Sequence, residues 1–232
     1  MKVSVILPTY NEAENIVNLI YAIIESIKAP WEYEIIVVDD NSPDGTLKKV
    51  QQSFQKNSAV IALLRSEKPG LALSIRAGIE RATGDQIIVM DTDFTHNPLE
   101  IPRLLHVGLL YNIVSGSRFC SGGNMQDRAH YVTSLIYNFF LRLILRTQLQ
   151  DNLGGYFTIK RENILELPMD KIFYGYGEYF FRLIYYAKQK GFVVVELPAQ
   201  YLNRSAGKSK SNFLKMLFTY SMAAVRLKIG GV

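Results

Sequence analysis

Hydrophobic and polar positions follow two alternating periods along the first half of the chain. Short apolar runs rich in β-branched residues predict strands over residues 2–8, 33–40, 59–65 and 85–93. Helical periodicity follows each of the first three runs, up to residue 27, up to residue 54 and over residues 70–84. Asn11 and Glu14 fit a capping box at the start of the first helix, and Gly84 fits the end of the third.

Less regular patterns fill the second half of the chain. After an apolar run in residues 111–119, the predicted elements are a long amphipathic helix, a turn, a helix and a strand, over residues 131–149, 151–157, 178–191 and 192–201. A basic Gly/Ser-rich loop at 203–212 leads to an amphipathic segment at 213–229. Because no internal repeat, low-complexity tract or linker divides the sequence, we expect one domain with an accessory C-terminal half.

Strands that are apolar on both faces and alternate with helices predict a parallel sheet covered on both sides. Ligands of such sheets bind beyond the carboxyl ends of the strands. In the run IIVMDTDFTHNP a strand leads into Asp91 and Asp93, and the second strand ends at Asp39 and Asp40. We therefore expect two pairs of carboxylates to converge at the ligand edge of the sheet.

Composition and charge narrow the class of protein. The chain has 232 residues, 48% of them hydrophobic and 20% charged, which is typical of a globular protein with a sizeable core. A single cysteine, Cys120, excludes an internal disulfide, and the sequence lacks a spanning-length apolar run or a signal peptide, so we expect a cytoplasmic protein. The net charge of +5 suits an anionic partner such as a phosphate or a membrane lipid.

Two carboxylates one residue apart on a turn can face the same divalent cation. Mg²⁺ and Mn²⁺ take oxygen ligands and keep substrate phosphates in their coordination shell, so the Asp91–Asp93 turn indicates a site for a nucleotide diphosphate. A solvated turn is the alternative interpretation. The Rossmann glycine fingerprint and the P-loop are absent, which argues against hydride transfer and P-loop hydrolysis. His96 is interpreted as a residue at the entry of a helix, with metal ligation as the alternative.

Six segments in order make the chain similar to family 2 glycosyltransferases of the GT-A fold, and within them to dolichol- and polyprenol-phosphate mannose synthases. The segments are SVILPTYNEAENI, IIVVDDNSPDGT, GIERATGDQIIVMDTDFTHNP, SGSRF, VVVELPAQY and RSAGKSK. The resemblance implies one GT-A domain over residues 1–232, with a Rossmann-like, mostly parallel sheet covered by helices on both faces. Residues 1–116 would bind the nucleotide sugar, and residues 117–232, with their amphipathic helices, the acceptor.

The same resemblance implies roles for individual residues. The nucleotide sugar would be bound by Pro8, Tyr10, Glu12, Asp40, Asp91, Thr92 and Asp93. The cation, Mg²⁺ or Mn²⁺, would be held by Asp93 and Thr95. The catalytic set would be Asp93, Arg118, Arg204 and Lys210, in which the three basic residues contact phosphates. The acceptor phosphate would be contacted by Arg118, Arg128 and Ser134.

The implied reaction is the inverting transfer of a hexose from a nucleotide sugar to a polyprenyl or dolichyl phosphate. GDP-mannose is favoured as the donor, with UDP-glucose as the alternative, and no nucleic acid is expected as a partner. A phosphate acceptor is already an anion and needs no general base. The chain departs from the mannose synthases at DNLGGYF, where that group carries Ser-Gly-Phe-Arg, and at YGYGEYFFRL. In the second segment Glu178 would act as general base if the acceptor were a hydroxyl.

The two amphipathic segments of the second half fit a membrane surface. In the first, basic Arg142 and Arg146 interleave with the apolar Tyr137, Phe139, Phe140, Leu141, Leu143 and Ile144. Packing against the sheet is the alternative explanation for the same pattern. We expect a peripheral protein at the inner face of the membrane, anchored by these segments or by a partner protein.

Two other classes of protein remain as alternatives. A nucleotidyltransferase would share the α/β architecture and the metal, but would carry a basic Gly-rich loop where this chain has PTYNEAEN. A non-catalytic membrane-binding scaffold would keep the amphipathic helices without a metal-dependent nucleotide site. Processive synthases are disfavoured, because the Gln-x-x-Arg-Trp motif is missing and the single tryptophan is Trp31.

Overall fold

A sheet flanked by helices forms the centre of the protein. The computed structural model describes residues 1–126, 128–202 and 213–230. The strands of the main sheet are β1 (Lys2–Thr9), β2 (Glu32–Asp39), β3 (Val60–Leu64), β4 (Gln86–Val89), β5 (Ile113–Ser117), β7 (Phe157–Lys160) and β8 (Val194–Pro198). A small second sheet pairs β6 (Asn124–Met125) with β9 (Gln200–Tyr201).

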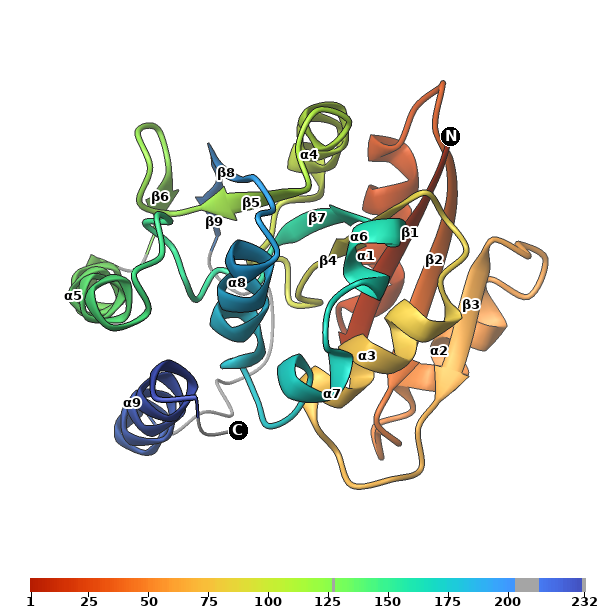
Figure 1. Cartoon of the computed structure of the whole chain (residues 1–232). Helices are drawn as coiled ribbons and strands as arrows, with labels where there is room; N and C mark the ends of the chain where they lie inside the picture. Colours follow the sequence, from red (N-terminus) through yellow and green to blue (C-terminus); the bar gives the residue numbers. More distant parts are fainter. Residues whose placement is uncertain (127, 203–212, 231–232) are drawn as a thin grey trace.

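Helices connect and cover these strands (Figure 1). The helices of the first half are α1 (Ile16–Ser26), α2 (Thr46–Ser53), α3 (Leu71–Arg81), the 3-10 turn η1 (Pro98–Glu100) and α4 (Ile101–Gly108). Those of the second half are α5 (Arg128–Leu145), α6 (Arg161–Leu165), α7 (Met169–Ile172), α8 (Tyr179–Gln189) and α9 (Phe213–Lys228).

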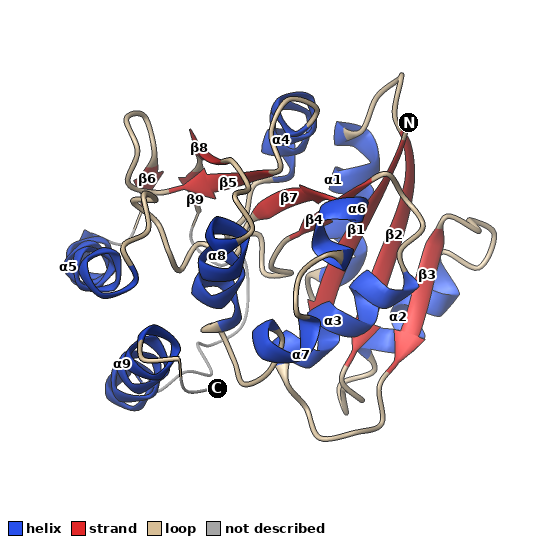
Figure 2. Ribbon diagram, in the orientation of Figure 1, coloured by secondary structure: helices blue, strands red, loops and turns tan. Residues whose placement is uncertain are grey.

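The main sheet is mostly parallel, as the sequence predicts. Within the described residues its order is β3-β2-β1-β4-β7-β5-β8, visible as the red strands that cross Figure 2. The pairs β1–β2, β1–β4, β2–β3 and β5–β8 are parallel, whereas β7 runs antiparallel to both β4 and β5. Thr9 pairs with Asp39 at the carboxyl ends of β1 and β2, so the polar residues that follow these strands begin at one edge.

Both faces of the sheet are buried, because neighbouring residues of each strand point to opposite sides. On one face Val5 and Val37 pack in a cluster with α1, α2 and α4. On the other face Ile6 and Val38 pack with α3, α7 and α8. The prediction of strands apolar on both faces is therefore confirmed.

Two predicted helix boundaries are wrong. α1 begins at Ile16 rather than beside Asn11, because Asn11 adopts a left-handed backbone conformation (φ 58°) and its N–H donates to the Ser42 hydroxyl at 2.9 Å. α3 ends at Arg81, three residues before Gly84. Gly84 instead meets β1, where an added Cβ would lie 2.7 Å from the backbone nitrogen of Ser4.

Three predicted segments differ in the structure. The regular part of the fourth strand is only Gln86–Val89, so Met90 and the aspartates beyond it belong to the following turn. The segment predicted as a turn over residues 151–157 leads directly into the unpredicted strand β7. The predicted strand over 192–201 is divided into β8 and β9, which belong to different sheets.

Helices α5 and α9 lie side by side at one edge of the molecule, outside the main sheet (Figure 1). Their shared contact buries Leu141, Leu145, Tyr220 and Ala224 against Phe181 of α8. One face of α5 is part of the core, where Leu141 packs against α8 and α9 rather than against the sheet, whereas Phe139 and Leu143 on the other face are 61% and 64% exposed. Contact of that exposed face with a membrane stays a prediction. No helix in the described ranges has the length and apolar character needed to cross a membrane.

Candidate active site

A cleft of about 500 Å³ lies at the carboxyl edge of β1, β2 and β4. Four separate segments of the first half contribute to its lining. The predicted nucleotide-sugar residues that line it are Pro8, Tyr10, Glu12, Asp40, Asp91, Thr92 and Asp93. The structure thus brings all seven residues together, although they span more than 80 positions of the sequence.

The loops after β1 and β2 hold each other in place. The Glu12 N–H donates to the Thr46 hydroxyl at 2.9 Å, and the Ala13 N–H donates to the Asp44 carboxylate at 3.0 Å. Asp44 is therefore a turn residue, whose carboxylate also accepts the N–H and the hydroxyl of Thr46, at 3.0 and 2.6 Å. Asp39 does not line the cleft, because its carboxylate accepts hydrogen bonds from the N–H and the hydroxyl of Ser42, at 2.8 and 2.6 Å.

Asp40 is fixed by partners that the sequence analysis missed. Its carboxylate pairs with the guanidinium of Arg65 and accepts the Gly70 N–H at 2.8 Å. Arg65 follows β3, is 9% exposed and also donates to the Ser74 hydroxyl at 3.1 Å. The available signal was its position, since a basic residue that ends the third parallel strand arrives at the same edge as Asp40.

The Asp91–Asp93 turn is ordered by its own side chains. Asp93 is 6% exposed, and its Oδ1 accepts the Thr95 N–H at 3.1 Å and the Thr95 hydroxyl at 2.6 Å. The Asp91 side chain is 48% exposed, and its N–H donates to Nδ1 of His96 at 2.9 Å. His96 is buried and lies two residues before η1, so its interpretation as a residue at the entry of a helix holds. Through the bond from the Asp91 N–H, it also contacts the turn.

The donor set of this turn fits a hard divalent cation. Mg²⁺ is commonly held by one or two carboxylates while substrate phosphates and water complete its shell. Asp91 and Asp93 line the cleft together and supply such carboxylates. The described residues contain no group of three His, Cys, Asp or Glu side chains placed to hold a metal, so phosphate oxygens would have to contribute. The direct ligation by Thr95 stays a prediction.

Arg118 is buried and paired within the protein. Its Nε and Nη2 each donate to the Asp151 carboxylate at 2.7 Å, and its guanidinium lies 5.0 Å from the ring centroid of Tyr201. Burial opposes the charge, yet Asp151 outweighs that effect and raises the pKa of Arg118 above its ordinary value. Arg118 does not line the cleft, and its predicted phosphate contact would compete with Asp151.

The other predicted phosphate contacts lie apart from the cleft or outside the described residues. Arg128 is exposed at the first position of α5. Ser134 is half-buried in α5, where its carbonyl accepts the side-chain amide of Asn138 at 2.9 Å. Arg204 and Lys210 fall in residues 203–212, outside the ranges that the structure describes. Their roles stay predictions.

Glu178 points to a different cavity from the one that contains the aspartates. Its Oε2 accepts the Tyr176 N–H at 3.0 Å, and its Oε1 lies 3.3 Å from Nη2 of the buried Arg182. Together with Arg182, Glu178 lines a cavity of about 570 Å³ between α7, α8 and α9. Glu178 is therefore not among the residues that line the cleft of Asp91 and Asp93.

The far wall of the cleft comes from the second half of the chain and was not predicted. It consists of Leu153, Gly154, Gly155, Tyr176, Gly177, Tyr179, Phe180 and Tyr220. Gly154 approaches other backbone closely, since an added Cβ would lie 3.1 Å from the carbonyl oxygen of Gly116. The pairs of glycines in DNLGGYF and YGYGE were the available signal, because such glycines often mark close backbone approach.

A cleft that contains an Asp-x-Asp turn at the carboxyl edge of a mostly parallel sheet defines the class of site. Residues 4–167 match the Glycosyl transferase family 2 domain, and the chain therefore belongs to glycosyltransferase family 2. Its sheet, flanked by helices, matches solved structures of the GT-A fold. One of them is glucosyl-3-phosphoglycerate synthase from Mycobacterium tuberculosis in complex with Mn²⁺, UDP and phosphoglyceric acid (TM-score 0.75, 20% identity, covering 100% of this chain and 79% of that one).

Three curated relatives are named for polyprenyl-phosphate chemistry. The chain is 33% identical to the dolichol-phosphate mannosyltransferase of Pyrococcus furiosus, over 98% of this chain and 64% of that protein. It is 30% identical to the undecaprenyl-phosphate mannosyltransferase of Micrococcus luteus, over 90% of this chain and 87% of that protein. It is also 30% identical to the polyprenol monophosphomannose synthase of Mycolicibacterium smegmatis, over 96% of this chain and 86% of that protein. The chain thus spans about two thirds of the Pyrococcus protein.

Proposed function

We propose that this protein is a metal-dependent, inverting glycosyltransferase that moves a hexose from a nucleotide sugar to a polyprenyl phosphate. The observation that carries the proposal is the convergence of the seven predicted donor-binding residues on one cleft that contains the Asp91–Asp93 turn. The names of the three relatives support mannose as the sugar and a polyprenyl phosphate as the acceptor. GDP-mannose is the favoured donor.

Different residues of the cleft would bind the cation and the donor. Asp91 and Asp93 would hold Mg²⁺ or Mn²⁺, which when bound neutralises negative charge that develops on the departing diphosphate. Asp40, held by Arg65 and Gly70, presents a fixed carboxylate to the donor. A donor placed between the two walls of the cleft reacts with less loss of entropy, because its anomeric carbon is oriented before the acceptor attacks.

The placement of Glu178 supports a phosphate acceptor over a hydroxyl acceptor. A hydroxyl must lose a proton as it attacks, which requires a base within hydrogen-bonding reach. Glu178 is bound to Tyr176 and Arg182 and lines the neighbouring cavity, so it does not face the donor cleft. A phosphate monoester is already deprotonated at neutral pH and attacks without a base.

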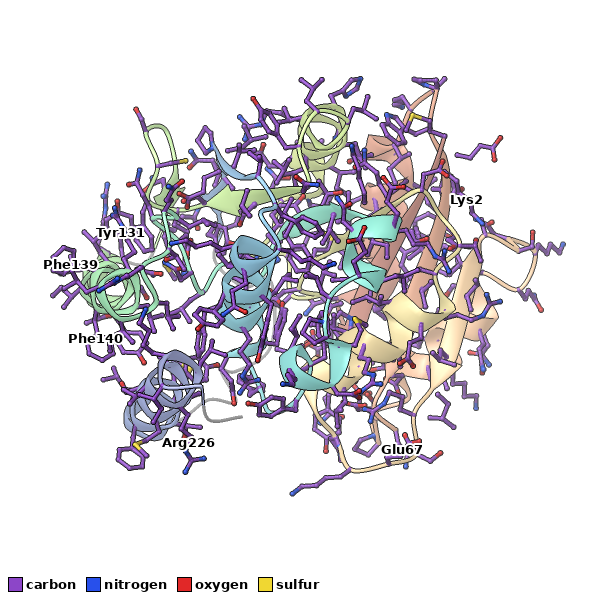
Figure 3. All side chains as sticks on the ribbon, viewed as in Figure 1. Lys2, Glu67, Tyr131, Phe139, Phe140 and Arg226 are labelled. Atoms are coloured by element: carbon purple, nitrogen blue, oxygen red, sulfur yellow. The ribbon has the colours of Figure 1, made fainter. Side chains whose placement is uncertain are left out.

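The outer faces of α5 and α9 support contact with a membrane, where a polyprenyl phosphate would reside. The exposed apolar residues of α5 recur at helical spacing: Val132, Leu135, Ile136, Phe139, Phe140 and Leu143. On α9 the exposed apolar residues are Phe218, Met222 and Val225, followed by Ile229 just after the helix; Phe218 and Met222 also line the cavity between α7, α8 and α9. Figure 3 shows Phe139 and Phe140 on the outer side of α5, with the exposed Arg226 on neighbouring α9. Apolar faces flanked by basic residues are typical of interfacial helices, and we place them at the cytoplasmic leaflet.

A direct assay tests the proposal. The protein is incubated with Mn²⁺, a panel of sugar nucleotides and polyprenyl phosphate, and glycolipids are identified by mass spectrometry. We expect a hexosyl phosphopolyprenol with wild-type protein, and none with Asp93→Ala, which removes a carboxylate from the cation site. Unphosphorylated polyprenol serves as the matched acceptor control. A product on polyprenol but not on its phosphate would contradict the proposed acceptor, and no product with any donor would contradict the activity.

A further inference from the structure

His96 lies beneath the Asp91–Asp93 turn, and it is not among the residues that line the cleft. Its side chain is 1% exposed. The imidazole stacks on Tyr156, with ring centroids 4.8 Å apart and an interplanar angle of 9°, and meets the edge of Tyr201 at 4.7 Å and 73°. Aromatic packing on two sides therefore leaves the ring a single well-defined orientation.

That orientation directs Nδ1 at the backbone of the acidic turn. The Asp91 N–H donates to Nδ1 at 2.9 Å, and a nitrogen that accepts this bond carries no proton. The proton of the neutral ring is then on Nε2, which lies 3.8 Å from Oδ2 of Asp91.

The turn contains a residue whose backbone needs external support. Phe94 has φ 65°, in the left-handed region that non-glycine residues rarely occupy. Such a conformation persists when the surrounding contacts determine it. Thr95 secures the Asp93 end of the turn through two hydrogen bonds, and His96 secures the Asp91 end. An antiparallel bridge between His96 and Tyr201 ties this arrangement to β9.

We propose that His96 is a positioning residue: a neutral imidazole, protonated on Nε2, that fixes the backbone of Asp91 so that the Asp91 and Asp93 carboxylates face one cation. In this role His96 is not itself a metal ligand, because its Nδ1 is engaged by the Asp91 N–H and its ring is enclosed by tyrosines. The inference rests on the proposed function, which supplies the cation, and goes beyond it by assigning a supporting residue.

Two substitutions separate the hydrogen bond from the packing. His96→Phe keeps an aromatic ring against Tyr156 but removes the acceptor, whereas His96→Asn removes the ring but keeps an acceptor at the position of Nδ1. Loss of a partner that supports a metal ligand typically weakens metal affinity by about 10- to 100-fold. We therefore expect His96→Phe to weaken Mn²⁺-dependent binding of a nucleoside diphosphate by about that factor. His96→Asn should stay within about threefold of wild type.

The matched control is Tyr156→Phe, which removes a different hydrogen bond from the same loop. The Tyr156 hydroxyl donates to the carbonyl of Asn97 at 3.0 Å, and the ring that stacks on His96 is kept, so this variant should bind like wild type. Binding is measured by electron paramagnetic resonance of free Mn²⁺ and by calorimetry, with thermal unfolding as the check on folding. In parallel, long-range ¹H–¹⁵N spectra of the metal-free wild-type protein should assign the His96 proton to Nε2.

The outcomes separate this inference from the proposed function. Wild-type Mn²⁺ affinity in a folded His96→Phe protein would overturn the positioning role, as would a spectrum with the proton on Nδ1. Equal losses in His96→Phe and His96→Asn would assign the effect to packing and also overturn it. If the wild-type protein bound nucleoside diphosphate without any dependence on Mn²⁺, the proposed function would fail first and the inference with it.

Discussion

Two of the predicted site residues are held by ion-pair partners that lie far away in the sequence. Asp40 is held by Arg65, and Arg118 is held by Asp151, which is fully buried and 33 positions further along. Breaking a buried pair of this kind costs about 3–5 kcal/mol, because the remaining charge is left without a partner. Arg118 is thus part of the packed structure, whatever contact it makes during the reaction.

The two acceptor hypotheses differ at one residue, Glu178. We expect Glu178→Gln to keep most of the turnover with a polyprenyl phosphate, because the carboxylate faces Arg182 and not the donor cleft. The amide can still accept the Tyr176 N–H that Glu178 now accepts. A general base would instead contribute about 10² to 10⁴-fold. Steady-state kinetics with saturating donor measure the difference.

Arg182→Met provides the control for that experiment. This change removes the ion-pair partner of Glu178 and the hydrogen bonds to the carbonyls of Ile172 and Tyr174, but it keeps the carboxylate, so it measures the turnover that is lost when the surroundings of Glu178 are disturbed. If Glu178→Gln folds and binds donor normally but loses about three orders of magnitude in kcat, the hydroxyl-acceptor mechanism replaces the proposed one.

At the scale of elements, the sequence predicts the strands well and the local turns poorly. β1 to β4 were predictable because buried parallel strands read as continuous apolar runs. β7 was missed because four residues, FTIK, are too short to show a period, and its pairing with β4 and β5 depends on the whole sheet. The predicted helix cap at Asn11 was wrong for a similar reason, because the backbone of Asn11 is held by Ser42 in the loop after β2.

β1, β2 and the segment after α3 share one buried carboxylate, Glu34. Burial alone would raise the pKa of Glu34, but hydrogen bonds from Lys2, Ser4 and Thr83 outweigh it and lower the pKa to about 2. A depressed pKa stabilises the folded state above the unfolded value of about 4.5, and this stabilisation is lost as pH falls toward 2.

We therefore expect Glu34→Gln to lower the free energy of unfolding at pH 7 by about 2–3 kcal/mol, the order of magnitude that a shift of this size implies. The difference between the two proteins should shrink between pH 4.5 and pH 2. Urea unfolding across this range measures it, with Glu32→Gln, an exposed acid of the same strand, as the control. A difference that is constant with pH would contradict the linkage.

The exposed apolar side chains of α5 and α9 lead to a prediction about membrane binding. Phe139→Glu and Phe218→Glu replace side chains that are 61% and 70% exposed, so folding should be unaffected. Burying a phenylalanine contributes about 1.5–3 kcal/mol, so each change should weaken binding to vesicles that contain anionic lipid by at least about tenfold. Sedimentation with the vesicles measures the bound fraction.

Leu110→Glu is the matched control for these variants. Leu110 is 77% exposed and comes just after α4, a helix that lies at the top of Figure 1, away from α9 at the lower left. Its replacement adds the same charge and should leave vesicle binding unchanged. Equal losses in all three variants would show that net charge, and not the α5 and α9 faces, governs the interaction.

At the scale of the whole molecule, both halves of the chain contribute to the main sheet and to the cleft. β7 lies between β4 and β5, so strands from both halves form one sheet. The cleft likewise has a first wall from residues 8–93 and a second wall from residues 153–220. The sequence predicts the acidic wall because its residues follow strands. It does not predict the second wall, which depends on how α8 and α9 pack.

Tyr220 connects helix α9 to the cleft. It belongs to α9, whose outer face is apolar, yet its side chain is buried and lines the nucleotide cleft. On the cleft side it meets Gly177, where an added Cβ would lie 2.2 Å from the Tyr220 hydroxyl oxygen and 3.2 Å from the ring carbon that bears it. The proposed membrane-facing helix and the donor cleft are therefore in direct contact through one close approach.

This contact gives a prediction that a double-mutant cycle can test. Gly177→Ala should displace the loop or α9 and weaken donor binding, with a loss on the order of tenfold, because the added methyl group overlaps the hydroxyl. Adding Tyr220→Phe removes the overlapping oxygen, so the double variant should regain most of the lost affinity, although Tyr220→Phe alone gains none. Calorimetry with the preferred donor and Mn²⁺ measures all four proteins. Additive effects of the two substitutions would show that the loop and α9 adjust independently, because coupled residues in contact deviate from additivity by about 0.5–3 kcal/mol.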